Sequence, residues 1–160
     1  MVAINILMMA DSITIKFDFA GFIKSIEPKF KKIRDPEYLL RPVAIELIPL
    51  MTRRIHINGK AADGSSIGTY SDSYMRERAR HKRTEPQNKV VVALTSKLEN
   101  DWTVVPTEKG YGIGFLTDLS AKKARWVEGN FGKDIFSLSA AEEKFAFKRL
   151  NELINDAFSL

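Results

Sequence analysis

The sequence contains no cysteine and only two histidines among its 160 residues. The absence of cysteine excludes disulfide bonds, thiolate zinc sites and a cysteine nucleophile. His56 and His81 are separated by a glycine-rich stretch and match no known ligand spacing, so we expect no bound metal ion. We interpret both histidines as surface or packing residues.

Sequence motifs of catalysis are missing as well. There is no Gly-x-Ser-x-Gly elbow, and residues 110–114, Gly-Tyr-Gly-Ile-Gly, lack the Gly-Lys-Ser/Thr ending of a phosphate-binding loop. Alternation of glycine with Tyr111, Ile113 and Phe115 indicates a strand that another backbone or subunit approaches closely. We therefore expect neither enzymatic activity nor a cofactor.

No hydrophobic run has the length of a membrane span. Residues 2–10 are apolar, but they are far too short for a span and lack the basic lead of a signal peptide. We expect neither secretion nor membrane association.

The composition is that of one ordinary globular domain, with 44% hydrophobic and 28% charged residues. We expect a single domain over residues 1–160 with an α+β fold. In it, a small mixed or antiparallel sheet packs with a long helix in the N-terminal half and with a C-terminal helix. A long extended loop, residues 58–89, completes the domain, because turn-forming residues and a basic run replace any core-forming pattern there.

The N-terminal half predicts two strands and one helix. Residues 2–7 form a candidate strand, and residues 13–19 form a better one because apolar and polar residues alternate there. Asp35, Pro36 and Glu37 are typical of a helix start. Apolar residues then recur at helical spacing as far as residue 51, although Pro42 and Pro49 should kink the helix, and we expect an irregular end near residues 52–55.

The C-terminal half predicts short elements in a fixed order. A helical turn or two over residues 95–100 precedes a hairpin formed by residues 102–105 and 110–115, with Trp102 in the core. Residues 120–128 predict a helix that stops at Gly129. Ser139 and Glu142 form a capping box that begins the last helix. One side of that helix should carry its apolar residues, Phe147, Leu150, Ile154, Ala157 and Phe158.

Positive charge is concentrated in residues 76–89. This run accounts for +4 of the net charge of +5, and its basic residues are Arg76, Arg78, Arg80, Lys82, Arg83 and Lys89. Three interpretations remain open: a solvated loop, contact with an acidic protein surface, or contact with phosphates. Tyr70 and Tyr74 lie upstream and no aromatic residue lies inside the run, which argues against sequence-specific nucleic-acid recognition.

Trp126 has two equally weighted interpretations. It follows Lys122, Lys123 and Arg125 on an amphipathic turn, so it is either a core residue or an interface anchor. The candidate interface residues are therefore Tyr70, Tyr74, Arg76, Arg78, Arg80, Lys82, Arg83, Arg125 and Trp126.

The order of the C-terminal motifs resembles the virion morphogenesis and tail-completion proteins of tailed bacteriophages. Members of that family carry a helix, a Leu-Thr-Gly-x-Leu turn, a β-hairpin, a short helix before a glycine, and a Phe-Leu-Ser stretch before the last helix. The matching segments are residues 94–98, 102–105, 110–115, 124–129 and 135–143, although Ser96 replaces the usual glycine and Asp134-Ile135 replaces the commoner basic residue. Residues 54–56, 59–60 and 63–70 are similar to a variant in phages of Bacteroides-type hosts.

This resemblance implies a non-enzymatic subunit of the virion, made in the bacterial host cytoplasm and repeated as a ring at the neck between head connector and tail. Its partners would be copies of itself and the neighbouring connector and tail proteins, with non-specific DNA contact as a further possibility. A ring requires two different surfaces on each subunit, and we expect residues 58–88 to order against a neighbour on assembly. The alternative is a small basic protein that binds nucleic acid through residues 76–89.

Overall fold

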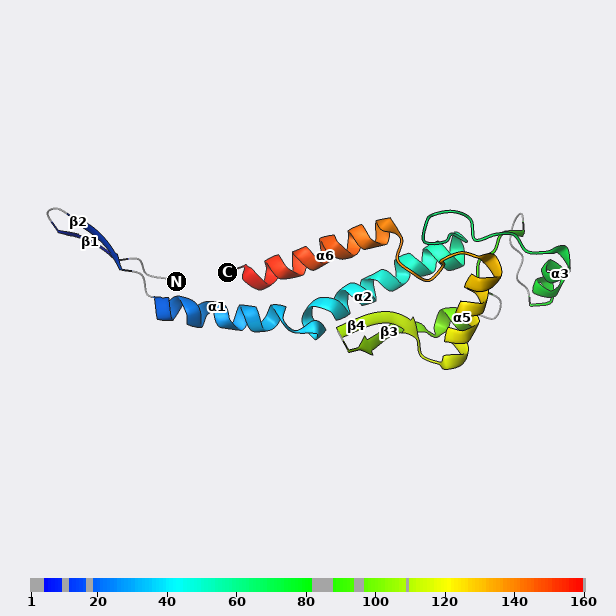
Figure 1. Ribbon diagram of the computed structural model, residues 1–160, viewed down its shortest axis with the longest axis horizontal. Coiled ribbons are helices and arrows are strands. Elements are labelled where there is room, and N and C mark those ends of the chain that lie inside the picture. Colours follow the sequence, from blue (N-terminus) through cyan, green and yellow to red (C-terminus); the bar gives the residue numbers. More distant parts are fainter. Residues whose placement is uncertain are drawn as a thin grey trace.

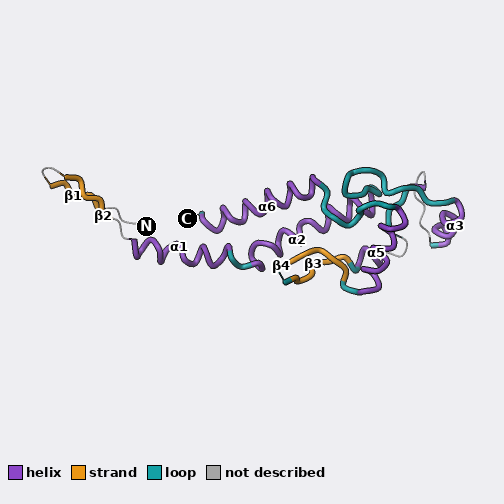
Figure 2. The backbone as a smooth tube through the Cα atoms, in the orientation of Figure 1, coloured by secondary structure: helices purple, strands orange, loops and turns teal. Residues whose placement is uncertain are grey.

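The computed structural model describes the backbone of residues 5–9, 12–16, 19–81, 88–93, 97–108 and 110–159, and the side chains from residue 20 onward within these ranges. Helices predominate over strands (Figures 1 and 2). The elements in chain order are β1 (Asn5–Met9), β2 (Ser12–Lys16), α1 (Phe19–Ile33), α2 (Pro36–Thr52), the π-helical turn η1 (Arg53–Ile57), α3 (Asp72–Arg80), α4 (Lys97–Asn100), β3 (Trp102–Thr107), β4 (Gly110–Phe115), α5 (Asp118–Phe131) and α6 (Ala140–Phe158).

The molecule is elongated, and α2 is its central element. Helices α1 and α2 follow one another along the long axis, and α6 runs back beside α2 (Figure 1). Val43 and Leu47 of α2 pack with Leu153 of α6 in one buried cluster. The antiparallel β3–β4 hairpin packs against α2 as well. The expected α+β fold, with a long helix, a C-terminal helix and a small sheet, is confirmed.

Helix α2 begins and ends as its sequence predicts. The Asp35 carboxylate accepts a hydrogen bond from the Glu37 amide at 3.0 Å, and Pro36 occupies the first turn, where its missing N–H costs nothing. Pro42 and Pro49 lie inside the helix. The irregular end is the π-turn η1, in which the Asn58 amide donates to the Arg53 carbonyl five residues earlier at 2.9 Å.

The β3–β4 hairpin is confirmed, with Trp102 opposite Phe115. Trp102 is 7% exposed and belongs to the main core, as predicted. The close neighbour of the glycine-rich strand is α2 at one end, because a Cβ added to Gly110 would lie 2.6 Å from Leu40 Cδ1. The hairpin is fastened there by Tyr111, whose hydroxyl donates to the Glu37 carboxylate and lowers the pKa of that group.

The N-terminal region differs from its prediction. Strand β1 covers Asn5–Met9 instead of residues 2–7, and residues 2–4 lie outside the described ranges. Strand β2 ends at Lys16, and Phe19 opens α1, a helix that we did not predict. Apolar residues from Phe19 onward recur at helical spacing, but the two-residue alternation over residues 13–19 led us to assign Phe19 to a strand. Pro28, which usually interrupts a helix, made the helical pattern of α1 harder to detect.

Residues 58–89 are more ordered than the predicted extended loop. Ser71 caps α3, which lies inside this segment. Ala61 and Ile67, each 1% exposed, pack in the main core with Met51 and Ile55. Residues 82–87 lie outside the described ranges. Two isolated apolar residues among turn formers do not make a periodic pattern, so the sequence did not indicate that this segment helps to build the core.

The last two helices require two corrections. Helix α5 continues through Gly129 and ends at Phe131, and the following Gly132 has a φ of 61°, the left-handed conformation common after helix ends. Phe147 does not lie on the buried side of α6, because it is 68% exposed. Leu153 and Ala157 are the buried apolar residues there. The capping box of Ser139 and Glu142 is confirmed, and α4 starts at Lys97, since residues 94–96 lie outside the described ranges.

Alanine substitutions of the two glycines near the end of α5 should have opposite effects on the free energy of unfolding. Gly129 is in the helix interior with open space around it, so Gly129→Ala should raise the free energy of unfolding by about 0.5–1 kcal/mol. Gly132→Ala should lower it by about 1–2 kcal/mol, because alanine is strained at positive φ. Urea denaturation of both variants measures the two effects. If the helix ended at Gly129, Gly129→Ala would be the destabilising substitution and Gly132→Ala would not.

Candidate functional site

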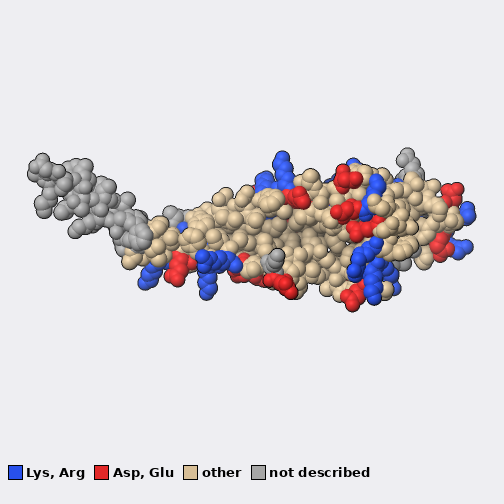
Figure 3. Space-filling model, in the orientation of Figure 1, with Lys and Arg blue, Asp and Glu red and all other residues tan. Residues whose placement is uncertain are grey.

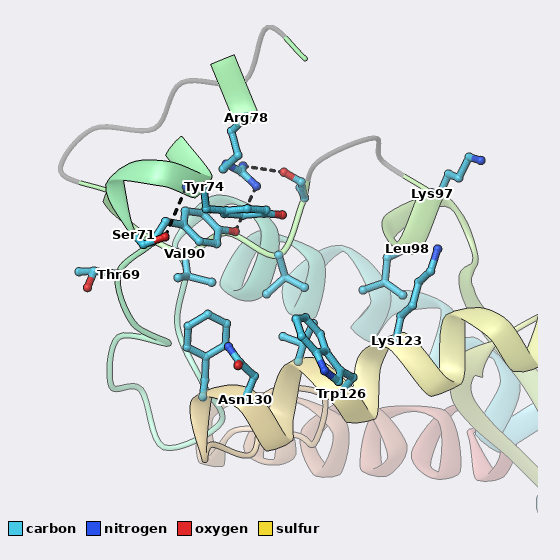
Figure 4. Close-up of a pocket in the computed structure, with 15 residues that line it drawn as sticks. Thr69, Ser71, Tyr74, Arg78, Val90, Lys97, Leu98, Lys123, Trp126 and Asn130 are labelled. Atoms are coloured by element: carbon cyan, nitrogen blue, oxygen red, sulfur yellow. Dashed lines mark hydrogen bonds between the residues drawn. The ribbon is translucent and has the colours of Figure 1, made fainter. Parts of the chain in front are cut away.

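An open groove lies between α3 and α5 at the end of the molecule that is far from α1 (Figures 1 and 4). Its volume is about 640 Å³, within the usual range of ligand pockets. Residues 90–93 form its floor and α4 contributes to its edge. We call it the aromatic groove, and its lining residues are Thr69, Tyr70, Ser71, Tyr74, Arg78, Val90, Val92, Ala93, Lys97, Leu98, Lys123, Trp126, Val127, Asn130 and Phe131.

Helix α3 forms one wall because its sequence favours a short capped helix. The Ser71 hydroxyl accepts a hydrogen bond from the Tyr74 amide, and Asp72 lies in the first turn, where negative charge stabilises a helix. The rings of Tyr70 and Tyr74 lie 5.0 Å apart. Tyr74 is 39% exposed, so this wall presents an aromatic surface to the groove.

Arg78 fastens this wall to the floor. Its guanidinium is buried, donates to the Ala93 carbonyl at 2.7 Å and to the Tyr70 hydroxyl at 3.2 Å, and lies 4.4 Å from the centre of the Tyr70 ring. The Tyr70 hydroxyl also accepts a hydrogen bond from the Val91 amide. The prediction of Arg78 as a surface contact residue is wrong, because only 1% of it is exposed.

The other members of the basic run do not form one continuous surface. Arg76 and Arg80 are exposed on α3, and Arg80 pairs with Glu77 at 2.6 Å. Lys82 and Arg83 lie outside the described residues. Lys89 extends away from the run and donates to the Ile57 carbonyl. The described part of the run is therefore divided by the buried Arg78.

Helix α5 forms the opposite wall and carries Trp126. The Thr117 hydroxyl caps the helix and also donates to the Asp101 carboxylate. Ala124 faces the interior, and Trp126 is 69% exposed on the side that borders the groove. Of the two interpretations of this tryptophan, burial in the core is excluded.

Basic side chains gather over α5 (Figure 3). Lys122, Lys123 and Arg125 are all exposed, and Lys123 lies one helical turn before Trp126 on the groove side. Among the described residues these three side chains form no ion pair, and Arg125 donates only to the Ala121 carbonyl. The groove therefore combines an apolar floor with a cationic edge.

Two sequence segments thus meet at one site. The structure brings together the predicted residues Tyr70, Tyr74 and Trp126 around the groove, while Arg125 lies beside it. Sequence reasoning missed Lys97 and Lys123, which complete its edge. The spacing of Lys123 from Trp126 was a usable signal, because residues three apart share a helix face. Nothing in the sequence indicated Lys97.

His56 supports the groove floor from behind. Its Nδ1 donates to the Val92 carbonyl at 3.1 Å, and the ring is buried. Burial lowers the pKa of His56 below its usual value, because a charged imidazolium is poorly solvated there. His81, in contrast, is exposed beside Glu77.

The depressed pKa of His56 predicts a loss of stability in acid. The unfolded chain takes up a proton near pH 6.5 and the folded protein only at lower pH, so stability is complete above about pH 6.5 and declines as pH falls below it. In urea denaturation at about pH 7.5 and about pH 5.5, His56→Asn should reduce this difference. An equal pH-dependent difference in His56→Asn and in the unsubstituted protein would contradict the prediction.

Within the described ranges, no helix is long and apolar enough to cross a membrane, and no group of three or more histidine, aspartate or glutamate side chains could hold a metal ion. Comparison of the chain with models of known protein families, with curated protein sequences and with solved structures finds no match.

Proposed function

We propose that the protein is a structural subunit of a phage virion, repeated head to tail as a ring at the junction of head and tail. The observation that carries this proposal is a pair of unlike, incompletely covered apolar surfaces, one at the groove and one on α1. The elements that carry them, α3 with α5 and α1, lie toward opposite ends of the subunit (Figure 1). A ring is built from such heterologous contacts, whereas a twofold dimer uses the same surface twice. The resemblance of the C-terminal motif order to tail-completion proteins supports the same function.

The first surface is the aromatic groove together with the exposed start of α5. Leu119 and Trp126 lie seven residues apart on α5, and so on one face of the helix, and are 62% and 69% exposed. Leu116, just before the helix, is 69% exposed. Exposed apolar residues that gather in one place indicate an interaction site more strongly than scattered ones do. Tryptophan, tyrosine and arginine are also the residues that contribute most to interface energies.

The second surface is α1. Its apolar residues recur at helical spacing, yet none of its described side chains is buried. Its C-terminal half packs on α6, where the Phe30 ring meets the Phe158 ring at 5.7 Å. Ile23 and Phe30 remain 45% and 42% exposed. A helix with an uncovered apolar stripe is stabilised when a partner covers that stripe.

Electron microscopy of the purified protein and of labelled virions tests the proposal. We expect closed rings from the protein, and label at the neck of the virion. Trp126→Ala should prevent ring formation and leave the free energy of unfolding of the monomer within about 0.5 kcal/mol, because the side chain is exposed.

Phe147→Ala is the matched control, since Phe147 is an aromatic residue of nearly equal exposure (68%) outside the groove. It should leave ring formation intact. A protein that stays monomeric at all concentrations and is absent from virions would contradict the proposed function.

Nucleic-acid binding is the second candidate function, and one observation favours it. Trp126 lies between exposed cations, which is the combination that single-stranded nucleic acids use for stacking and for phosphate contact. For this candidate we propose Lys97, Lys122, Lys123 and Arg125 as the phosphate-contacting residues in place of the run 76–89, because Lys97 and Lys123 line the groove and Lys122 and Arg125 are exposed beside them on α5. Binding of a single-stranded oligonucleotide that weakens steeply with salt, without ring formation, would favour this candidate over the first.

A further inference from the structure

We infer that α1 of one copy packs antiparallel against the exposed face of α5 in the aromatic groove of the next copy. The inference rests on the proposed head-to-tail function and names the two helix faces that would join neighbouring subunits. These faces match in spacing, in apolar character and in charge.

The uncovered face of α1 is apolar and has one acidic residue. Exposed residues recur on it at spacings of three and four, which places them on one side of the helix. They are Ala20, Ile23, Glu27 and Phe30. The first half of α1 projects past the C-terminal end of α6 (Figure 1), so this part of the face is open to a partner.

Helix α5 presents a face with the same spacing. Its exposed residues there are Leu119, Lys123, Trp126 and Asn130. The last three of these residues line the aromatic groove. Lys97 and Lys123 lie on the side of the groove away from Ser71 (Figure 4), and neither lysine forms an ion pair within the described residues. The groove therefore offers an apolar, aromatic surface with positive charge on one side.

An antiparallel pairing brings the two faces into register, with Glu27 opposite Lys123. From this pair to the far end of each face is seven residues, or two helical turns of about 10 Å in total, so the two helices stay aligned. The resulting pairs are Ala20 with Asn130, Ile23 with Trp126, Glu27 with Lys123 and Phe30 with Leu119. Contacts at this spacing are those through which an amphipathic helix binds in an apolar groove.

Helix α6 disfavours the opposite, parallel pairing. A parallel α1 would place Phe30 opposite Trp126 and bring its own second half into the groove. The Phe30 ring contacts the Phe158 ring at 5.7 Å, so the end of α6 would have to enter the groove as well. In the antiparallel pairing, the projecting first half of α1 enters the groove, and Phe30 lies beside Leu119, which is outside it.

Both helices are basic overall, but the charges on the two matching faces are opposite. The four lysines of α1 lie off its uncovered face: Lys29 and Lys32 make contacts within their own chain, and Lys24 and Lys31 lie at its border. In a pair of helices, long side chains at the border extend into solvent. Glu27 is the one charged residue of the face itself, and within the described ranges it forms no ion pair. Its position opposite Lys123 determines the register of the two copies.

The α1 helix that binds in the groove has to come from a second copy. Within one chain, α1 and the groove lie toward opposite ends of the molecule (Figure 1). Helix α2 separates them with its 17 residues, a length of roughly 26 Å. The contact of Phe30 with Phe158 also holds α1 beside α6, away from the groove of its own chain.

The hydrogen bonds of the groove floor favour a helix over a strand as the bound element. The Val91 amide is bonded to the Tyr70 hydroxyl, and the carbonyls of residues 92 and 93 accept hydrogen bonds from His56 and Arg78. These backbone groups are already satisfied, so the floor does not offer them to an added strand. The bound element therefore makes its contacts through side chains, as a helix does.

Cysteine cross-linking tests the contact and its direction, because the chain has no cysteine of its own. An Ala20→Cys variant is mixed with an Asn130→Cys variant, which places a thiol at the groove edge. The thiol-specific cross-linker is shorter than roughly 16 Å, the distance between residues 20 and 31 along α1. Because each chain carries one thiol, every mixed product joins two copies. We expect a cross-linked dimer from this pair.

Lys31→Cys is the matched control for direction, because residue 31 is exposed on the same helix at its other end. Mixed with Asn130→Cys, it should give less product than Ala20→Cys by about tenfold or more, since the antiparallel pairing places it two to three turns beyond the groove thiol. A parallel pairing would reverse the two yields.

Charge reversal tests the pair of Glu27 with Lys123. Adding Glu27→Lys to the Ala20→Cys chain should lower the yield about tenfold or more, because it places like charges opposite each other. Adding Lys123→Glu to the Asn130→Cys chain should do the same. When both changes are present in the mixture, the yield should return to within about threefold of the original pair. Glu143→Lys, a change of an exposed acid on α6, is the control and should leave the yield within about twofold.

Three results would overturn the inference. The first is a higher yield from Lys31→Cys than from Ala20→Cys. The second is a combination of Glu27→Lys and Lys123→Glu that restores nothing. The third is protection of the Asn130→Cys thiol by single-stranded DNA but not by a second copy, which would assign the groove to nucleic acid.

The two proposals fail in different ways. Rings that form in virions while Glu27→Lys has no effect would leave the proposed function intact and remove the inference. Specific cross-linking by a protein that is absent from virions would establish the contact between copies and remove the proposed function.

Discussion

Replacing Arg54 with methionine should lower the free energy of unfolding by about 3–5 kcal/mol, because it leaves a charge buried without its partner. Arg54 lies in η1 and is 8% exposed, and its Nε donates to the Glu142 carboxylate at 2.9 Å. The guanidinium also donates to the carbonyls of Lys60, Ile135 and Ser137. One side chain thus joins η1, the start of residues 58–89 and the start of α6.

Glu142 adds to this effect because it has a second role. It is the third residue of α6 and the glutamate of the capping box, and its Oε2 accepts a hydrogen bond from the Ser139 amide at 2.8 Å. Without Arg54, the same carboxylate would have to remain buried to cap α6 or leave the helix start uncapped.

Urea denaturation followed by tryptophan fluorescence measures the loss. Arg53→Met is the control, because Arg53 is adjacent and exposed, and its effect should stay within about 0.5 kcal/mol. The double variant Arg54→Met/Glu142→Met should lose less than the sum of the two single variants, since neither charge of this pair is left buried without its partner. A loss below about 1 kcal/mol for Arg54→Met alone would show that the buried pair contributes little.

Gly59→Ala should lower the free energy of unfolding by roughly 2–4 kcal/mol, the second large effect, through positive-φ strain and a backbone clash. Gly59 has a φ of 60°, and an added Cβ would lie 2.2 Å from the Val90 carbonyl oxygen. That oxygen belongs to the backbone of the groove floor and cannot move independently of it. The substitution therefore separates the end of η1 from residues 88–93.

Gly64→Ala is the matched control for the clash. Gly64 also has a positive φ, 79°, but an added Cβ would meet nothing within 4 Å. Gly64→Ala should lower the free energy of unfolding by only roughly 1–2 kcal/mol, because alanine is strained in the left-handed conformation. The difference between the two variants in thermal or urea denaturation isolates the contact with Val90, and equal losses would mean that this contact is relieved by small shifts.

The sequence predicted best those elements whose signals are local. Asp35 with Pro36, and Ser139 with Glu142, define helix starts through contacts within four residues, and both starts are found in the structure. The β3–β4 hairpin could be predicted equally well, because its alternating residues and its turn lie within 14 residues of sequence.

What sequence reasoning missed depends on contacts between distant segments. Arg78 is indistinguishable from its exposed neighbours in a basic run, and only the Ala93 carbonyl and the Tyr70 ring explain its burial. The groove itself unites α3 with α5, almost fifty residues apart, so its residues were predicted as two separate candidates. Helix α1 was missed because a strand-like alternation precedes it and Pro28 interrupts it.

The π-turn at the end of α2 has a geometric consequence for assembly. Each residue of an α-helix advances the chain by about 100° around the helix axis, and a π-turn accommodates one additional residue. Five residues, Arg53–Ile57, therefore change the direction in which the chain leaves α2 for the groove-bearing end. In the proposed head-to-tail ring, the angle between the two ends of the subunit would contribute to the number of subunits in the circle.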